Sequence, residues 1–132
     1  MDIEKASSIV NAKFRYKTDP EQYSWRDAWR IIPPSGEGDC EDYSISIIFE
    51  LAERKWWKFI LYILLHKATI YHVKTPNNHA VLRVGDKYID NRFQIWMDKE
   101  DYSTYSFKFP YPGFIVLLQL LIGYLIVIMK NK

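Results

Sequence analysis

Cysteine is almost absent from this sequence, because Cys40 is the single example among 132 residues. One cysteine excludes an intrachain disulfide, and it also excludes a metal centre built from several thiolates. Internal repeats and low-complexity segments are missing as well, which excludes solenoid and array architectures. The chemistry of Cys40 therefore has to be inferred from the residues around it.

The sequence also lacks an excess of charge of one sign. It contains 18 basic and 16 acidic residues, and Lys130 and Lys132 account for the difference. Without a basic field, we expect no nucleic-acid partner. The N-terminal residues show no basic stretch followed by an apolar one, which predicts that there is no secretory signal and that the protein resides on the cytoplasmic side.

Hydrophobic residues make up 48% of the chain and aromatic residues 17%, which is enough for a packed core in a single domain. Apolar residues at helical spacing predict helices over residues 2–16, 23–32, 40–54 and 56–65. A run rich in β-branched and aromatic residues predicts a strand over residues 68–73. Helices followed by strands are typical of an α+β fold.

A β-hairpin is predicted near the middle of the chain. Residues 79–84 and 87–92 flank Gly85-Asp86, a two-residue turn with glycine first, as a type II′ turn prefers. A turn of fixed length also fixes which residues of the two strands lie opposite each other.

This register brings His79 and Asp90 to the same face of the hairpin as diagonal neighbours. Such neighbours lie roughly 7–8 Å apart at the backbone, within reach of an imidazole–carboxylate hydrogen bond. The opposite face carries Ala80, Leu82 and Ile89, which suit a core. The alternatives are a solvated strand histidine and an aspartate that caps the strand end.

Cys40 follows a turn-rich run, 33–38, and Asp39, which is a good N-cap. It therefore lies in the first turn of a predicted helix, where unpaired N–H groups and the helix dipole stabilise a thiolate. The thiolate is the nucleophilic form of cysteine, so Cys40, His79 and Asp90 together predict a Cys–His–Asp catalytic site. The alternative for Cys40 is a buried, inert cysteine.

Three motifs resemble those of the bacterial transglutaminase-like cysteine peptidases. They are Gly38-Asp-Cys-Glu-Asp-Tyr43, Asn78-His-Ala-Val-Leu82 and Tyr88-Ile-Asp-Asn91, and the similarity covers about residues 8–95. The resemblance implies a papain-like, transglutaminase-like α+β fold, in which a helix carrying the nucleophile Cys40 packs against a small antiparallel sheet carrying His79 and Asp90. It also implies a protein or peptide substrate and no required cofactor.

The resemblance adds further candidate residues. Trp25 and Trp29 are candidate oxyanion donors through the indole N–H, with core packing as the alternative, and the backbone N–H of Cys40 is a further donor. Some members of the family bind calcium near the acidic motif, which falls on Asp39 and Glu41 here. Two carboxylates in the first turn also stabilise a helix without any metal.

Two apolar segments depart from the family pattern, at residues 56–65 and 114–129. The second is at the lower limit for a membrane span, which needs roughly 17–20 apolar residues. We therefore predict a peptidase domain over 1–110 and a C-terminal apolar helix over 111–132 that associates with a membrane. A helix buried in the core or in an oligomer is the alternative. The small size and these segments resemble compact phage-encoded versions of the fold.

The predicted function is a thiol hydrolase that cleaves a peptide or isopeptide amide bond through a thioacyl intermediate. With an acceptor amine in place of water, the same site would act as a transglutaminase, and on glutamine side chains it would act as a deamidase. The motifs are also compatible with a non-catalytic, membrane-associated binding protein that keeps the fold. A small membrane protein in which the motifs are accidental is a third hypothesis.

Overall fold

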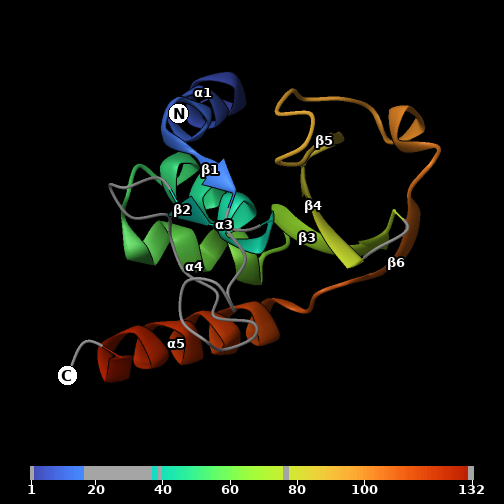
Figure 1. Ribbon diagram of the computed structural model, residues 1–132. Helices are drawn as coiled ribbons and strands as arrows, with labels where there is room; N and C mark the ends of the chain where they lie inside the picture. The colour runs from blue at the N-terminus through green and yellow to red at the C-terminus, as the bar shows by residue number, and fades with distance from the viewer. Residues whose placement is uncertain (1, 17–36, 39, 76–77, 131–132) are drawn as a thin grey trace.

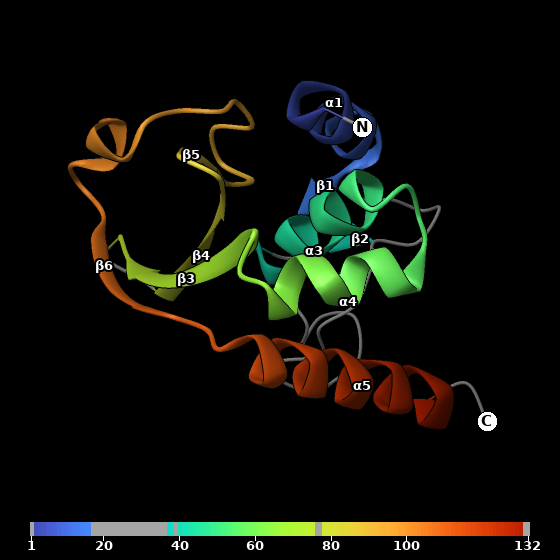
Figure 2. The ribbon, with the colours of Figure 1, turned by 180° about the vertical axis from the view of Figure 1, so that it is seen from behind.

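Figure 1 shows a computed structural model of the chain, in which residues 2–16, 37–38, 40–75 and 78–130 are described. Within these residues, the helices gather on one side and a four-stranded antiparallel sheet lies on the other, which is the predicted α+β class (Figures 1 and 2). The elements are α1 (Ile3–Lys13), β1 (Arg15–Tyr16), β2 (Glu37–Gly38), α3 (Cys40–Leu51), α4 (Trp56–Leu64), β3 (Ala68–Lys74), β4 (Asn78–Val84), β5 (Lys87–Ile89), the 3-10 helix η1 (Lys99–Tyr102), β6 (Ser106–Pro110) and α5 (Gly113–Lys130).

Helix α1 begins directly after Asp2, whose carboxylate caps it by accepting a hydrogen bond of 2.8 Å from the backbone N–H of Lys5. It ends at Lys13 and does not reach residue 16 as predicted, since β1 pairs in parallel with β2. Helix α3 is also shorter than predicted. Glu53 and Arg54 adopt positive φ angles of 56° and 60°, which are incompatible with a right-handed helix.

The predicted hairpin is present in the predicted register. Val84 lies opposite Lys87, and Gly85 between them has a φ of 63°, which a type II′ turn requires at that position. The second strand is shorter than predicted, since β5 ends at Ile89. The chain turns at Asp90 because its side chain accepts a hydrogen bond of 3.1 Å from the backbone N–H of Phe93.

The sheet has the strand order β5-β4-β3-β6. Strand β6, which the sequence did not predict, pairs antiparallel with β3 and forms an edge of the sheet. It ends at Pro110, and proline is tolerated on an edge strand because its missing N–H faces no neighbouring strand. The long return from β5 to β6 also contains η1, which was not predicted either.

Helix α3 lies at the centre of the core, between α1 and the sheet (Figure 1). Its Tyr43 and Ile47 are fully buried, and the hairpin contributes Ala80, Leu82 and Ile89, as its alternation predicted. Other buried residues of the same cluster come from α1, α4 and α5, namely Ala6, Val10, Phe59, Ile63, Val116 and Leu120. One core therefore joins all four α-helices of the described residues to the hairpin.

Polar contacts tie the N-terminal helix to the segment that follows Asp90. The side-chain amide of Asn11 donates a hydrogen bond of 3.0 Å to the carbonyl of Gln94, and its oxygen accepts one from the Tyr43 hydroxyl. The indole N–H of Trp96 donates to the carbonyl of Ile3 at 3.1 Å. Asn11 thus bridges the helix that begins with Cys40 and the turn that begins with Asp90.

Both apolar segments form helices, as α4 and α5. In the part of the chain that the structure describes, no helix is both long enough and apolar enough to cross a membrane. The helix predicted over residues 23–32, and most of the turn predicted over 33–38, lie outside the described residues.

Candidate active site

Cys40 is the first residue of α3 and is buried. Its Sγ lies 3.1 Å from Oε2 of Glu41, and Ser44 donates a hydrogen bond of 3.1 Å to its backbone carbonyl. Because a carboxylate can only accept, the contact with Glu41 belongs to a thiol that carries its proton. The position at a helix N-terminus, which the sequence predicts, is therefore present, and the thiol has an acidic neighbour.

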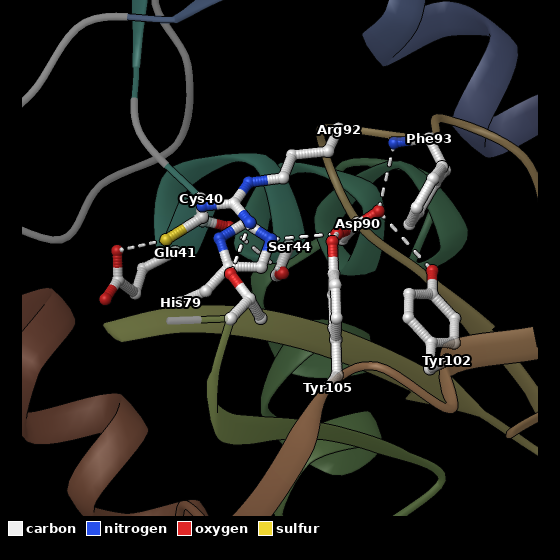
Figure 3. A network of polar contacts seen from close by, with 10 residues as sticks. Cys40, Glu41, Ser44, His79, Asp90, Arg92, Phe93, Tyr102 and Tyr105 are labelled. Carbon is white, nitrogen blue, oxygen red and sulfur yellow. Dashed lines mark hydrogen bonds and ion pairs between the residues drawn. The ribbon is translucent and has the colours of Figure 1, made fainter. Parts of the chain in front are cut away.

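His79 and Asp90 form the hydrogen bond that the hairpin register predicts. Nε2 of His79 lies 2.8 Å from Oδ2 of Asp90, and both side chains are buried. In the view of Figure 3, the His79 ring lies between Asp90 and the end of α3 that carries Cys40. Because Nε2 contacts Asp90, Nδ1 is the ring nitrogen that points elsewhere. The buried Asp90 carboxylate thereby fixes the orientation of the imidazole.

The Asp90 carboxylate accepts three further hydrogen bonds. The Tyr105 hydroxyl donates to Oδ2 at 3.0 Å, while the backbone N–H of Phe93 and the Tyr102 hydroxyl donate to Oδ1 at 3.1 Å and 3.4 Å. In Figure 3, Phe93 and Tyr102 lie on the side of the carboxylate away from Cys40, and the Tyr105 hydroxyl lies at the oxygen that also contacts His79. Burying a carboxylate is costly unless hydrogen bonds replace its water, and here four donors including His79 do so.

Tyr102 and Tyr105 are functional candidates that the sequence did not predict. Burial raises the pKa of Tyr102 well above its ordinary value, and the negative charge of Asp90 raises it further. Burial and the Asp90 charge also raise the pKa of Tyr105. Both phenols therefore keep their protons and remain donors to Asp90. Sequence reasoning missed them because they follow a turn-rich segment without periodicity.

Arg92 brings a permanent positive charge to the edge of this network. Its guanidinium donates a hydrogen bond to the Thr75 hydroxyl, and a further hydrogen bond to Tyr105 partly offsets the raised pKa of that phenol. Figure 3 shows the Arg92 side chain extending from the Asp90 end of the network toward the Cys40 end. The network thus contains a guanidinium as well as a carboxylate and an imidazole.

Comparison with known proteins identifies the family of the chain and a solved structure with a similar fold. The family described as bacterial transglutaminase-like cysteine proteinase BTLCP matches residues 1–107. This chain belongs to that family. Among solved structures, LapG of Legionella pneumophila has a similar fold, with a TM-score of 0.60 and 20% sequence identity. The alignment covers 83% of this transglutaminase-like chain and 62% of the LapG chain, so the present chain spans less than two thirds of that length. A search of curated proteins finds no match.

The remaining predicted site residues of this transglutaminase-like proteinase are only partly described. Trp25, Trp29 and Asp39 lie outside the described residues, so the oxyanion and calcium predictions for them stay predictions. Glu41, the other predicted calcium ligand, lies beside the Cys40 thiol. Within the described ranges, no group of three or more histidine, cysteine or acidic side chains is arranged to hold a metal ion.

Proposed function

We propose that this proteinase-family chain hydrolyses an amide bond of a protein or peptide, with Cys40 as the nucleophile, His79 as the proton carrier and Asp90 as the residue that orients His79. The observation that carries the proposal is the buried hydrogen bond of 2.8 Å between His79 and Asp90. A binding protein has no evident need for a buried carboxylate that holds one tautomer of an imidazole. A thiol hydrolase requires it, because the base must present an unprotonated nitrogen.

The hydrogen bond assigns different roles to the two ring nitrogens. Nε2 donates to the Asp90 carboxylate, so it carries the proton in the neutral ring. Nδ1 is then unprotonated and accepts the proton of the Cys40 thiol. For this transfer the thiol turns from Glu41 toward His79. The negative charge of Asp90 stabilises the imidazolium that forms, without accepting the proton itself.

The reaction then proceeds in two halves. The Cys40 sulfur attacks the amide carbonyl, an S–C bond forms, and the oxygen gains a negative charge that the backbone N–H of Cys40 stabilises as a hydrogen-bond donor. His79 gives its Nδ1 proton to the leaving amine as the C–N bond breaks, and a thioester remains. A water molecule gives a proton to His79 and attacks the thioester. The S–C bond breaks, the acid product leaves, and the proton returns to sulfur.

The first test is the rate of Cys40 alkylation by iodoacetamide over a pH range of about 5 to 9. Cys40 is the single cysteine, so labelling reports on one thiol. We expect fast labelling below about pH 7 in the wild type, because an imidazole partner stabilises the thiolate, and loss of that phase in His79→Ala. The matched control is His72→Ala, because His72 lies on β3 and contacts Tyr111 at 3.3 Å.

The opposite result would be a rate that rises only near the free-thiol pKa of about 8.5 and is the same in all three proteins. To separate hydrolysis from transfer, a peptide library is digested with and without methylamine, and the products are weighed by mass spectrometry. We expect products that have gained water, none with Cys40→Ala, and an adduct with hydroxylamine that traps the thioester. Methylamine incorporation as the main product would assign transamidation instead.

A further inference from the structure

Helices α4 and α5 lie side by side and run in opposite directions (Figures 1 and 2). The start of α5 touches the end of α4, because a Cβ atom at Gly113 would lie only 2.9 Å from the carbonyl oxygen of Ile63. At the other end, the rings of Trp56 and Tyr124 are 6.2 Å apart. A groove of about 340 Å³ runs between the helices and is lined by both of them. The two helices therefore share one surface.

The outward side of this surface is apolar throughout. All the exposed residues of α5 whose side chains are described are large and hydrophobic, and α4 and its last turn add six more. They are Trp56, Trp57, Ile60, Leu61, Leu64, Leu65, Phe114, Leu118, Leu121, Ile122, Leu125, Ile128 and Met129. We call these thirteen residues the α4–α5 face.

The area of the α4–α5 face is too large for an ordinary water-facing surface. On average these thirteen side chains are about half exposed, so together they present on the order of 1,000 Å² of apolar surface to solvent. The largest apolar patch on a typical soluble monomer covers roughly 300–600 Å². The difference indicates that the face is covered by something when the protein works.

The distribution of charge distinguishes two possible partners for the α4–α5 face, a second copy of this chain and a lipid surface. Residues 51–67 and 111–132, which hold the two helices and their flanks, contain six basic residues and one acidic residue, whereas the rest of the chain contains 12 basic and 15 acidic residues. Arg54 pairs with Glu50 and Lys58 with Glu53, so the other four, all lysines, carry the excess of positive charge. Two copies of this chain joined through the α4–α5 face would bring two positively charged regions together. A surface of anionic lipids offers the opposite charge and an apolar interior at the same time.

A second hollow, of about 370 Å³, lies beside α4 where the lysines are. Its lining includes Trp57, Tyr62, Lys67 and the ion pair of Lys58 with Glu53, whose Nζ and Oε1 atoms are 2.8 Å apart. Lys58 lies 5.6 Å from the Trp57 ring centre and Lys67 lies 6.0 Å from that of Tyr62. Aromatic rings and lysines gather at the headgroup level of membrane proteins, because each has an apolar body and a polar end. Lys67 is thus the lysine of this hollow that would meet a phosphate headgroup, since Glu53 already pairs with Lys58.

We propose that the α4–α5 face binds the surface of an anionic lipid bilayer, with both helices lying flat along it. The exposed leucine and isoleucine side chains enter the acyl region, and Lys55 and Lys67 meet the lipid phosphates, while Lys58 is paired with Glu53. This binding goes beyond the proposed hydrolysis and does not depend on it. It places the thiol chemistry next to a membrane and so favours substrates that are concentrated there.

The test is partition of the full chain into phosphatidylcholine vesicles with and without phosphatidylserine, measured by co-sedimentation. We expect binding that requires phosphatidylserine and weakens with salt. The combined variant Leu118→Gln, Leu121→Gln and Leu125→Gln should lower the partition coefficient at least about a hundredfold, because three partly inserted side chains lose their apolar contact. Lys55→Gln with Lys67→Gln should lower it about 25-fold, or about fivefold for each lysine.

The matched control is Ile95→Gln with Phe109→Gln, which removes exposed apolar residues elsewhere and should leave the partition unchanged. The Cys40 alkylation rate, compared between variants, shows that each one is folded. Absence of wild-type binding to phosphatidylserine vesicles would overturn the proposal. It would also be overturned if light scattering showed a dimer that the leucine variant dissociates while lipid binding is absent, since the face would then join two copies.

Discussion

Around Asp90, a fully buried carboxylate lies among aromatic side chains, whereas on α4 and α5 large apolar side chains face outward. Each region reverses the usual distribution, in which charge is outside and apolar groups are inside. The Asp90 region offsets the cost within the chain, because four donors replace the lost water. The α4–α5 face has no such compensation among the described residues. A buried charge whose cost the chain itself offsets, as at Asp90, indicates a functional site. Exposed apolar side chains that nothing in the described part of the chain covers, as on the α4–α5 face, indicate a binding partner.

The largest expected effect comes from Asp90→Asn, which removes the charge of the buried carboxylate. An amide cannot hold the His79 tautomer as a carboxylate does, so turnover should fall about 10³–10⁴-fold. The free energy of unfolding should also fall by about 1–3 kcal/mol, because buried donors lose a charged acceptor. Steady-state kinetics and urea unfolding measure the two quantities. The control is Asp98→Asn, whose carboxylate pairs with Lys87 at the surface, and unchanged turnover in Asp90→Asn would refute the role.

A second prediction sharpens the comparison within one helix. Leu120 is 4% exposed and belongs to the core, whereas Leu118 is 50% exposed on the α4–α5 face. Leu120→Ala should lower the free energy of unfolding by about 2–5 kcal/mol, and Leu118→Ala should change it by less than about 0.5 kcal/mol. Chemical denaturation without lipid measures both. Equal losses in the two variants would mean that the outward side of α5 is packed against the rest of the chain.

Tyr105→Phe should have a smaller effect, because it removes one of the four donors to Asp90. The Tyr105 hydroxyl shares Oδ2 with His79, so its loss relaxes the position of the imidazole. We expect kcat to fall about 3–10-fold with KM little changed, corresponding to about 1 kcal/mol. Tyr102→Phe is the graded comparison, since its contact is longer at 3.4 Å and its effect should be smaller. A larger change in KM than in kcat would assign Tyr105 to substrate binding instead.

The smallest expected effect is a loss of stability at high pH. Burial, followed by the charge of Asp90, raises the pKa of Tyr43 and of Tyr102 above the unfolded value of about 10. The unfolded chain therefore releases these protons first, so the stabilisation is complete below about pH 10 and is lost as the pH rises toward the raised values. Thermal unfolding should show a melting temperature that falls above about pH 10, and less steeply in Tyr43→Phe. A slope that Tyr43→Phe leaves unchanged would contradict this assignment.

The parts of the fold that local chemistry determines could be predicted from the sequence. Asp2 caps α1, and the Gly85 turn fixes the register that places His79 and Asp90 on one face. The ends of elements were less predictable, because α3 stops at backbone angles of Glu53 and Arg54 that no residue pattern announces.

The surroundings of Asp90 could not be predicted for a different reason. Tyr102 and Tyr105 reach the carboxylate only because the chain folds back between β5 and β6, and that return has neither helical nor strand periodicity. Residue types alone also did not determine which side of α5 faces the core. That side was settled by the packing of Val116 and Leu120 against the same cluster as α3.

The hydrogen bonds of Asn11 determine when, during synthesis, the protein can fold. Asn11 and Gln94 are 83 positions apart, and Ile3 and Trp96 are 93 apart. A growing chain cannot make these contacts until Gln94 and Trp96 have left the ribosome, and closing such long loops slows folding. We therefore expect the thiol, the imidazole and the carboxylate to come into position together, and only once Trp96 has left the ribosome. Until then, a partly made chain has no working catalytic machinery.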